Sequence, residues 1–520
     1  MVAVASDQRR PSAITWLLAL AALRLLLHTL TNDQYGFHRD ELATLSDARH
    51  LAWGFPAYPP LTPFIARIAL EMLGPSPMAV RFFTALAQCV AMVITGLMAY
   101  EFGGRRSAQV AAALAAAASP VSLSAGHLFQ YVSFDYLWCV LTAYFVIRLL
   151  RTRNPRWWLA VGMAVGLGFL TRYTIAWLVA GLLIGFAATP ARKLLATRWF
   201  AAAIGLTVLV VLPGVLWQAH HGFVALELTN TIHARDVRIG RTDGFLWKQL
   251  LVPASIFTIP LWGAGLIWLF RRGEGVRWRA LGWAFLAAIV LFAFAQARDY
   301  YSAPLYPMLL AAGAVRFTQW PRRVRIAQGV GIGAGIAMGI ALILPVAPVN
   351  SVLFRIGAKI SGDHVEEIGW PELTAAVARV RDELPAADHP HSGIFAGNYG
   401  EAGALELLGP AYGLPAPISR VNSFWLRGYP DPPPQTLIVL GVSEAFVRAH
   451  FQACEIKATF HAPYGIENEE NGGFIRVCRG MKEPWPEFWR EVKLWSSSSF
   501  ARRGISTYTH VRRPQPRVAL

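Results

Sequence analysis

The stretch WWLAVGMAVGLGFLTRYTIAWLVAGLLIGFAAT, residues 157–189, decides the fold class. It is almost entirely apolar, its one charge is Arg172, and it is long enough to cross a bilayer. It can form one tilted helix, or two short helices broken near Thr171–Tyr173. In either case the stretch is typical of a membrane protein.

Composition agrees with this interpretation. Of the 520 residues, 55% are hydrophobic and 15% are charged, whereas soluble domains have about 25% charged residues. The sequence therefore excludes an ordinary soluble enzyme. A net charge of +17 in a soluble chain would suggest nucleic acid, but the basic residues gather between apolar stretches, so we expect no nucleic-acid partner.

Apolar stretches predict about eleven transmembrane helices and an α-helical polytopic fold. The first contains Arg24 and His28 and lacks a cleavage site, so we expect a retained helix with its N-terminus inside. The expected spans are 12–31, 78–100, 107–126, 132–150, 157–170, 174–189, 199–218, 249–270, 280–297, 302–316 and 326–347.

The positive-inside rule favours two passes in 157–189, because a single pass would turn the last three basic clusters outward. Arg172 then lies at the outer face. The clusters expected inside are Arg105/Arg106, 148–156, Arg192/Lys193/Arg198, 271–279 and 316–325.

This topology predicts three parts: a membrane domain, 1–348, with a first outer loop at 32–77; an outer α/β domain, 349–495; and a basic, disordered tail, 496–520. The outer domain is expected to contain a helix at 371–384 and strands at 392–396, 435–440 and 473–477. Cys454 and Cys478 lie in this domain, and the sequence leaves undecided whether they form a disulfide.

The first outer loop carries the densest chemistry, in the stretch Tyr35–Leu42. Asp40 and Glu41 beside Arg39 suit proton transfer from a hydroxyl next to a bound phosphate. The same two carboxylates could instead favour the start of a short helix at 41–52. Both interpretations stay open.

Other candidates are expected on the same side of the membrane. Asp135 lies near the start of a span, where a carboxylate needs a partner or a role. Arg172 and Arg298 are either anchors at helix ends or a seat for phosphate. His220, His221 and His233 are loosely spaced, so we interpret them as surface residues and predict no metal site.

The acidic first loop, Tyr58-Pro59-Pro60-Leu61, Leu170–Thr174 and Arg298–Pro307, in this order, resemble the bacterial glycosyltransferase family 39. That family belongs to the GT-C fold group, with the protein O-mannosyltransferases and the aminoarabinose transferases of lipid A. The resemblance covers about residues 15–350. It implies a membrane glycosyltransferase that moves a sugar from a polyprenyl-phosphate carrier to a lipid, glycan or protein acceptor outside the bacterial plasma membrane.

The resemblance also implies roles for residues. Asp40, with Glu41, matches the catalytic acidic pair, and Asp135 matches a second acidic position. Related aminoarabinose transferases have a Lys where this chain has Tyr58, so the donor phosphate needs other charges. The candidates are Arg39, Arg172 and Arg298 for the donor phosphate, and His38, Tyr58, Tyr131, Tyr300 and Tyr301 for substrate binding.

We expect no cofactor and no metal, because Arg can stabilise a leaving lipid phosphate. The competing class is a transporter or flippase of lipid-linked sugars. Such proteins tend to hold polar groups near the bilayer midplane, whereas the charged candidates here crowd the outer boundary. A membrane sensor is a third class, but the inner loops are too short for a signalling module.

Overall fold

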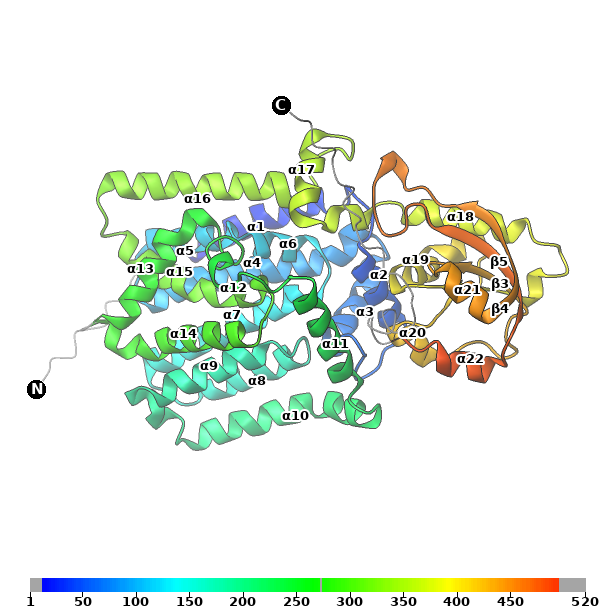
Figure 1. Ribbon diagram of the computed structural model, residues 1–520. Coiled ribbons are helices and arrows are strands. Elements are labelled where there is room, and N and C mark those ends of the chain that lie inside the picture. The colour runs from blue at the N-terminus through cyan, green and yellow to red at the C-terminus, as the bar shows by residue number, and fades with distance from the viewer. Residues whose placement is uncertain (1–11, 272–273, 495–520) are drawn as a thin grey trace, which may run out of the picture.

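The computed structural model describes residues 12–271 and 274–494. Figure 1 shows a bundle of helices at one end and a smaller α/β unit at the other, with helices α2 (Arg39–Arg49) and α3 (Leu61–Leu73) between them. The predicted tail 496–520 lies outside the described residues.

Six of the described helices are long and apolar enough to cross a bilayer, or seven spans if α5 and α6, bent by 67°, count as one. The chain is therefore a multi-pass membrane protein, as predicted, although the number eleven is not confirmed. The helices of the bundle are α1 (Ile14–Thr31), α4 (Pro77–Glu101), α5 (Arg106–Ala117), α6 (Pro120–His127), α7 (Tyr131–Thr152), α8 (Trp157–Phe169), α9 (Ile175–Ala187), α10 (Arg198–His220), α13 (Ile259–Phe270), α14 (Arg279–Phe294), α15 (Tyr306–Phe317) and α16 (Arg322–Ile343).

The stretch 157–189 forms two helices, as the charge distribution predicted. Helix α8 ends at Phe169 and α9 begins at Ile175. The carbonyl of Leu170, in the break, accepts a hydrogen bond of 2.9 Å from the backbone N–H of Leu61 at the start of α3. The break that contains Arg172 is thus tied to the start of α3.

The segments predicted as outer loops contain helices. Helix α2 falls close to the expected 41–52, but α3 was not predicted. The segment 219–248 contains α11 (Val224–Arg238) and α12 (Phe245–Lys248), and the segment after the last span contains α17 (Val352–Ser361).

The α/β unit has one five-stranded sheet with the order β2-β1-β3-β5-β4. Strand β1 pairs in parallel with β2 and β3, whereas β5 is antiparallel to β3 and β4. Cys454 and Cys478 form a disulfide between β4 and β5. The elements are α18 (Trp370–Asp382), β1 (Ser392–Ala396), α19 (Tyr399–Leu408), β2 (Ile418–Ser419), α20 (Asn422–Arg427), β3 (Thr436–Leu440), α21 (Glu444–His450), β4 (Phe451–Thr459), β5 (Phe474–Met481) and α22 (Trp485–Glu491).

Helix α19 packs directly on α2. A Cβ added at Gly403 would lie 2.7 Å from the backbone of Leu42, so only glycine allows this approach. Leu42 and Leu45 of α2 share one apolar core with Ala402 and Leu405 of α19. The α/β unit is therefore joined to the candidate catalytic segment by a packed core.

Candidate functional site

Helix α2 begins with a capping box that settles how its first residues are used. His38 is the N-cap, and its Nδ1 accepts a hydrogen bond of 3.2 Å from the backbone N–H of Asp40. Glu41 reaches back, and its Oε2 accepts a bond of 2.8 Å from the backbone N–H of His38. The cap is thus made by His38 and Glu41, so the carboxylate of Asp40 takes no part in it.

Glu41 is also half of a buried ion pair. Its Oε1 accepts hydrogen bonds from Arg81 Nε at 2.8 Å and from the backbone N–H of Phe129 at 2.6 Å. Its Oε2 accepts a further bond of 2.7 Å from Arg81. Arg81 also donates to Glu367 at 3.2 Å, and all three charged side chains are fully buried. Glu41 therefore has both oxygens engaged in supporting the start of α2.

Asp40 is held differently, by two neutral side chains. Its Oδ1 accepts a hydrogen bond of 2.8 Å from the hydroxyl of Tyr399, the first residue of α19. Its Oδ2 accepts a bond of 3.1 Å from Gln130. Asp40 is half-buried and has no salt bridge among the described residues. Such a carboxylate is oriented, yet no cation neutralises it.

Arg172 lies in an aromatic cluster. Its guanidinium is 4.1 Å from the ring centre of Tyr301, 5.0 Å from that of Tyr131 and 5.7 Å from that of Tyr300. Asp135 is its nearest carboxylate, at 3.9 Å. Tyr131 directly follows Gln130, which binds Asp40. The structure thus brings six of the predicted residues to one place, namely Asp40, Asp135, Arg172, Tyr131, Tyr300 and Tyr301.

Arg298 stands at the edge of the same cluster. It donates a hydrogen bond of 2.6 Å from Nε to Asp236 of α11 and a second from Nη2, and it also contacts the hydroxyl of Tyr300 at 3.3 Å. Asp236 also pairs with Arg235 at 3.1 Å and with Arg241 at 3.9 Å, so Arg298 shares this carboxylate with two other arginines.

Arg39 lies in a group of carboxylates. It pairs with Glu366 at 3.2 Å, with Glu469, and with Glu470 at 3.9 Å, and its guanidinium lies 5.1 Å from the ring centre of Tyr399. Three acidic neighbours leave little net positive charge for a phosphate.

Two carboxyl groups near Arg39 bind protons unusually tightly. Burial raises the pKa of Glu401 to about 8, and the neighbouring Glu470 adds to this effect. Burial likewise raises the pKa of Glu470 to about 7. One oxygen of Glu401 accepts the backbone N–H bonds of both Gly397 and Asn398, at 3.0 and 3.3 Å. A glutamine could accept the same two bonds without the charge.

We therefore expect Glu401→Gln to stabilise the protein at high pH only. A carboxyl group with a raised pKa stabilises the folded state below its unfolded pKa, and this contribution is lost as the pH rises towards 8. The advantage of the variant should grow from near zero at pH 5 to on the order of 2 kcal/mol at pH 8, measured by thermal unfolding in nanodiscs. The exposed Glu372→Gln is the control, and an equal effect at both pH values would contradict the prediction.

Tyr58 and His38, predicted to bind substrate, have structural partners. The hydroxyl of Tyr58 donates a hydrogen bond of 2.7 Å to Asp47. Asp47 also binds Ser423 at 3.1 Å and Arg427 at 2.6 Å, both from α20. Tyr58 thus helps to join α2 to the α/β unit, while its ring lies 5.9 Å from that of Tyr131.

Sequence reasoning missed the partners that hold the site. Arg81 carried a signal, because it is a charge within a predicted apolar span. Gln130 directly precedes Tyr131, which was predicted to bind substrate, but Gln130 itself was not predicted. Tyr399 and Glu367 gave no signal, since nothing in their local sequence indicates a partner so far away in the chain.

The comparisons with known proteins agree with this architecture. A family model described as dolichyl-phosphate-mannose-protein mannosyltransferase matches residues 57–217, a range that includes Asp135 and Arg172 but not Asp40. The lipid A galacturonosyltransferase RgtD of Rhizobium johnstonii is 24% identical over 328 residues, which are 61% of this chain and 68% of that protein.

Solved structures show the same fold. ArnT from Cupriavidus metallidurans, bound to undecaprenyl phosphate, matches with a TM-score of 0.60 and 13% identity over 90% of this chain and 98% of that one. The arabinofuranosyltransferase AftD from Mycobacteria matches with a TM-score of 0.53 and 15% identity over 91% of this chain and 40% of that one.

These matches confirm the GT-C fold and the resemblance to family 39. Together, the fold and the matches make this chain a membrane protein of the GT-C fold that is similar to the glycosyltransferases of family 39.

Proposed function

We propose that this protein transfers a sugar from a polyprenyl-phosphate carrier to a hydroxyl of a lipid, glycan or protein acceptor. One observation carries the proposal. Asp40 is oriented by the neutral side chains of Tyr399 and Gln130. Gln130 directly precedes Tyr131, which belongs to the aromatic cluster around Arg172. The names of the relatives support it, since they include glycosyltransferases and one structure bound to undecaprenyl phosphate.

In this mechanism Asp40 is the general base. It takes the proton of the acceptor hydroxyl while that oxygen attacks the anomeric carbon of the donor. The bond from this carbon to the phosphate oxygen breaks, and polyprenyl phosphate leaves with the electron pair. Attack on the face opposite the phosphate inverts the anomeric configuration, as the family resemblance implies.

Arg172 would stabilise the leaving phosphate. Of the three candidate arginines, Arg39 faces three carboxylates and Arg298 is paired with Asp236, whereas the nearest carboxylate to Arg172 is 3.9 Å away. A guanidinium can bind phosphate with two parallel hydrogen bonds, and the aromatic rings hold its plane. We therefore propose that the donor phosphate needs no metal ion and no cofactor.

Asp135 and Glu41 act through their neighbours. Asp135 accepts a hydrogen bond of 3.0 Å from Thr174 and lies beside Arg172, so it orients that guanidinium. Glu41 fixes the first turn of α2 and with it the position of Asp40. We further propose that this site and the α/β unit face outward from the bacterial plasma membrane, as the basic inner loops indicate.

The donor seat is tested by Arg172→Ala, which we expect to reduce transfer from polyprenyl-phosphate sugar by about 10²–10³-fold, as loss of one charge-stabilising donor does elsewhere. Arg172→Lys should recover part of the activity, because the charge survives and the bidentate geometry does not. The measurement is transfer of radiolabel from a polyprenyl-phosphate sugar by the purified protein in detergent.

The exposed Arg325→Ala on α16 is the matched control and should keep normal activity. An Arg172→Ala protein with normal turnover and normal dependence on donor concentration would refute the proposed seat. The assay in detergent also distinguishes a glycosyltransferase from a flippase. A flippase needs two compartments and produces no new glycosidic bond.

A further inference from the structure

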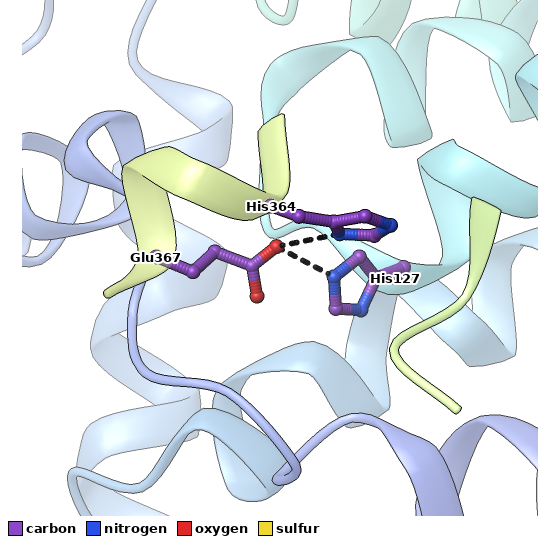
Figure 2. Close-up of side chains that lie close together, drawn as sticks. All are labelled: His127, His364 and Glu367. Carbon is purple, nitrogen blue, oxygen red and sulfur yellow. Dashed lines mark hydrogen bonds and ion pairs between the residues drawn. The ribbon is translucent and has the colours of Figure 1, made fainter. Parts of the chain in front are cut away.

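A second cluster of polar groups lies where the linker to the α/β unit, residues 362–369 between α17 and α18, meets helix α6 (Figure 2). His127 ends α6, and His364 and Glu367 lie in the short 3-10 helix Asp363–Glu367. In a 3-10 helix, residues three apart lie on the same side, so His364 and Glu367 face His127 together. All three side chains are buried, and their ligand atoms lie within 4.8 Å of one another.

The hydrogen bonds around His127 indicate which nitrogen carries its proton. Nδ1 lies 3.1 Å from Oδ1 of Asn32, and the Asn32 amide nitrogen donates to the carbonyl of Gly126 at 3.3 Å, which fixes the amide orientation. Nδ1–H therefore donates to Asn32. The Nε2 lone pair of a neutral His127 then points at Glu367 Oε1, only 3.0 Å away. Two acceptors at this distance require a cation between them.

The charges of the side chains around His127 also require a further cation. Glu41 and Glu367 supply two negative charges, and Arg81 supplies one positive charge, all fully buried. One negative charge is left without compensation, and burying it would be costly. Either a proton on His127 or a metal ion can balance it.

The spacing of the ligand atoms fits a metal ion. Zinc binds His nitrogen and Glu oxygen at about 2.0–2.1 Å, and a tetrahedron of such bonds separates neighbouring ligand atoms by about 3.3 Å. Glu367 Oε1 lies 3.0 Å from His127 Nε2 and 3.4 Å from His364 Nδ1. The bond from His127 Nδ1 to Asn32 is also the support that metal-binding histidines usually have.

We propose that His127, His364 and Glu367 bind a divalent transition-metal ion, with zinc the best match to two imidazoles and one carboxylate. The ion joins the linker to α6, and it does so at a place separate from the aromatic cluster around Arg172. Because Glu367 also binds Arg81, the ion supports the buried pair that holds α2. Its role is structural, so sugar transfer at the donor phosphate proceeds without it as a reactant.

The test is metal binding to the full-length protein in nanodiscs, without sugar donor or acceptor, so that the result is independent of the proposed function. After exposure to zinc and removal of excess metal, we expect inductively coupled plasma mass spectrometry to find about one zinc ion per chain. Cobalt(II) in place of zinc should give visible absorption bands of a tetrahedral site. His364→Phe keeps a ring against Tyr35 and should lose both signals.

The exposed His233→Ala is the matched control and should bind metal as the natural chain does. Asn32→Ala should weaken binding by about 10–100-fold, since it removes the support of His127; this variant also serves if His364→Phe does not fold. A natural chain that binds neither zinc nor cobalt at micromolar concentration would overturn the proposal and assign the cation to a proton on His127. Unchanged binding by both variants would overturn it as well.

Discussion

Asp40→Asn is expected to lower the turnover number by about 10²–10⁴-fold while the protein stays folded. Asparagine has the size of aspartate and can still accept the hydrogen bond from Tyr399, but it cannot accept a proton from the acceptor. The helix start should be unaffected, because His38 and Glu41 form the cap. Radiolabel transfer measures the loss, and thermal unfolding shows that the fold is intact.

Tyr399→Phe is the companion variant. It removes one partner of Asp40 and leaves the carboxylate in place, so its activity should fall between those of the natural chain and Asp40→Asn. If Asp40→Asn were stable and fully active, Asp40 would not be the base, and Asp135 would become the next candidate for that role.

Arg81→Leu is expected to destabilise the protein by about 3–5 kcal/mol, a large share of the usual total stability. The substitution leaves Glu41 and Glu367 buried without their guanidinium, and both carboxylates are fully inaccessible. Chemical unfolding in detergent micelles measures the change. Changing Glu41 and Glu367 to glutamine in the same chain should recover part of the stability, because the buried charges are then gone.

Arg67→Leu is the control for this effect. Arg67 pairs with Glu71 on the exposed side of α3, at 2.6 Å, with its side chain 41% exposed. Surface pairs of this kind contribute about 0–1 kcal/mol. A loss for Arg81→Leu no larger than that for Arg67→Leu would show that the buried network does not hold α2.

The sequence was informative where apolar length sets the structure. Runs such as 157–189 and the spacing of basic clusters predicted the helices and the break at Arg172. Helix α3 was not predicted, because its thirteen residues are too few for a transmembrane span and follow two prolines. Strand β4 was not predicted. Most of its side chains are exposed, so its sequence lacks the alternation of apolar and polar residues that marks a half-buried strand.

The site was predictable only in part, for a physical reason. Asp135, Arg172 and Tyr301 could be grouped because the predicted topology places them at the same membrane face. Their supporting contacts depend on tertiary packing, which no local pattern reports. Glu41 illustrates the difference, since its residue type suggested proton transfer and its four hydrogen bonds assign it to support.

The contact of α19 with α2 makes the support of Asp40 depend on the seating of the α/β unit. Tyr399 is 359 residues from Asp40 in the chain, and it reaches the carboxylate only while the α/β unit is seated on the bundle. If a conformation with the unit lifted away has Asp40 unsupported, the observed rate scales with the seated fraction. An acceptor or a lipid that favours the lifted state by about 1.4 kcal/mol then shifts the equilibrium between the seated and lifted states tenfold. Distant ligands could thereby tune transfer without touching a reacting atom.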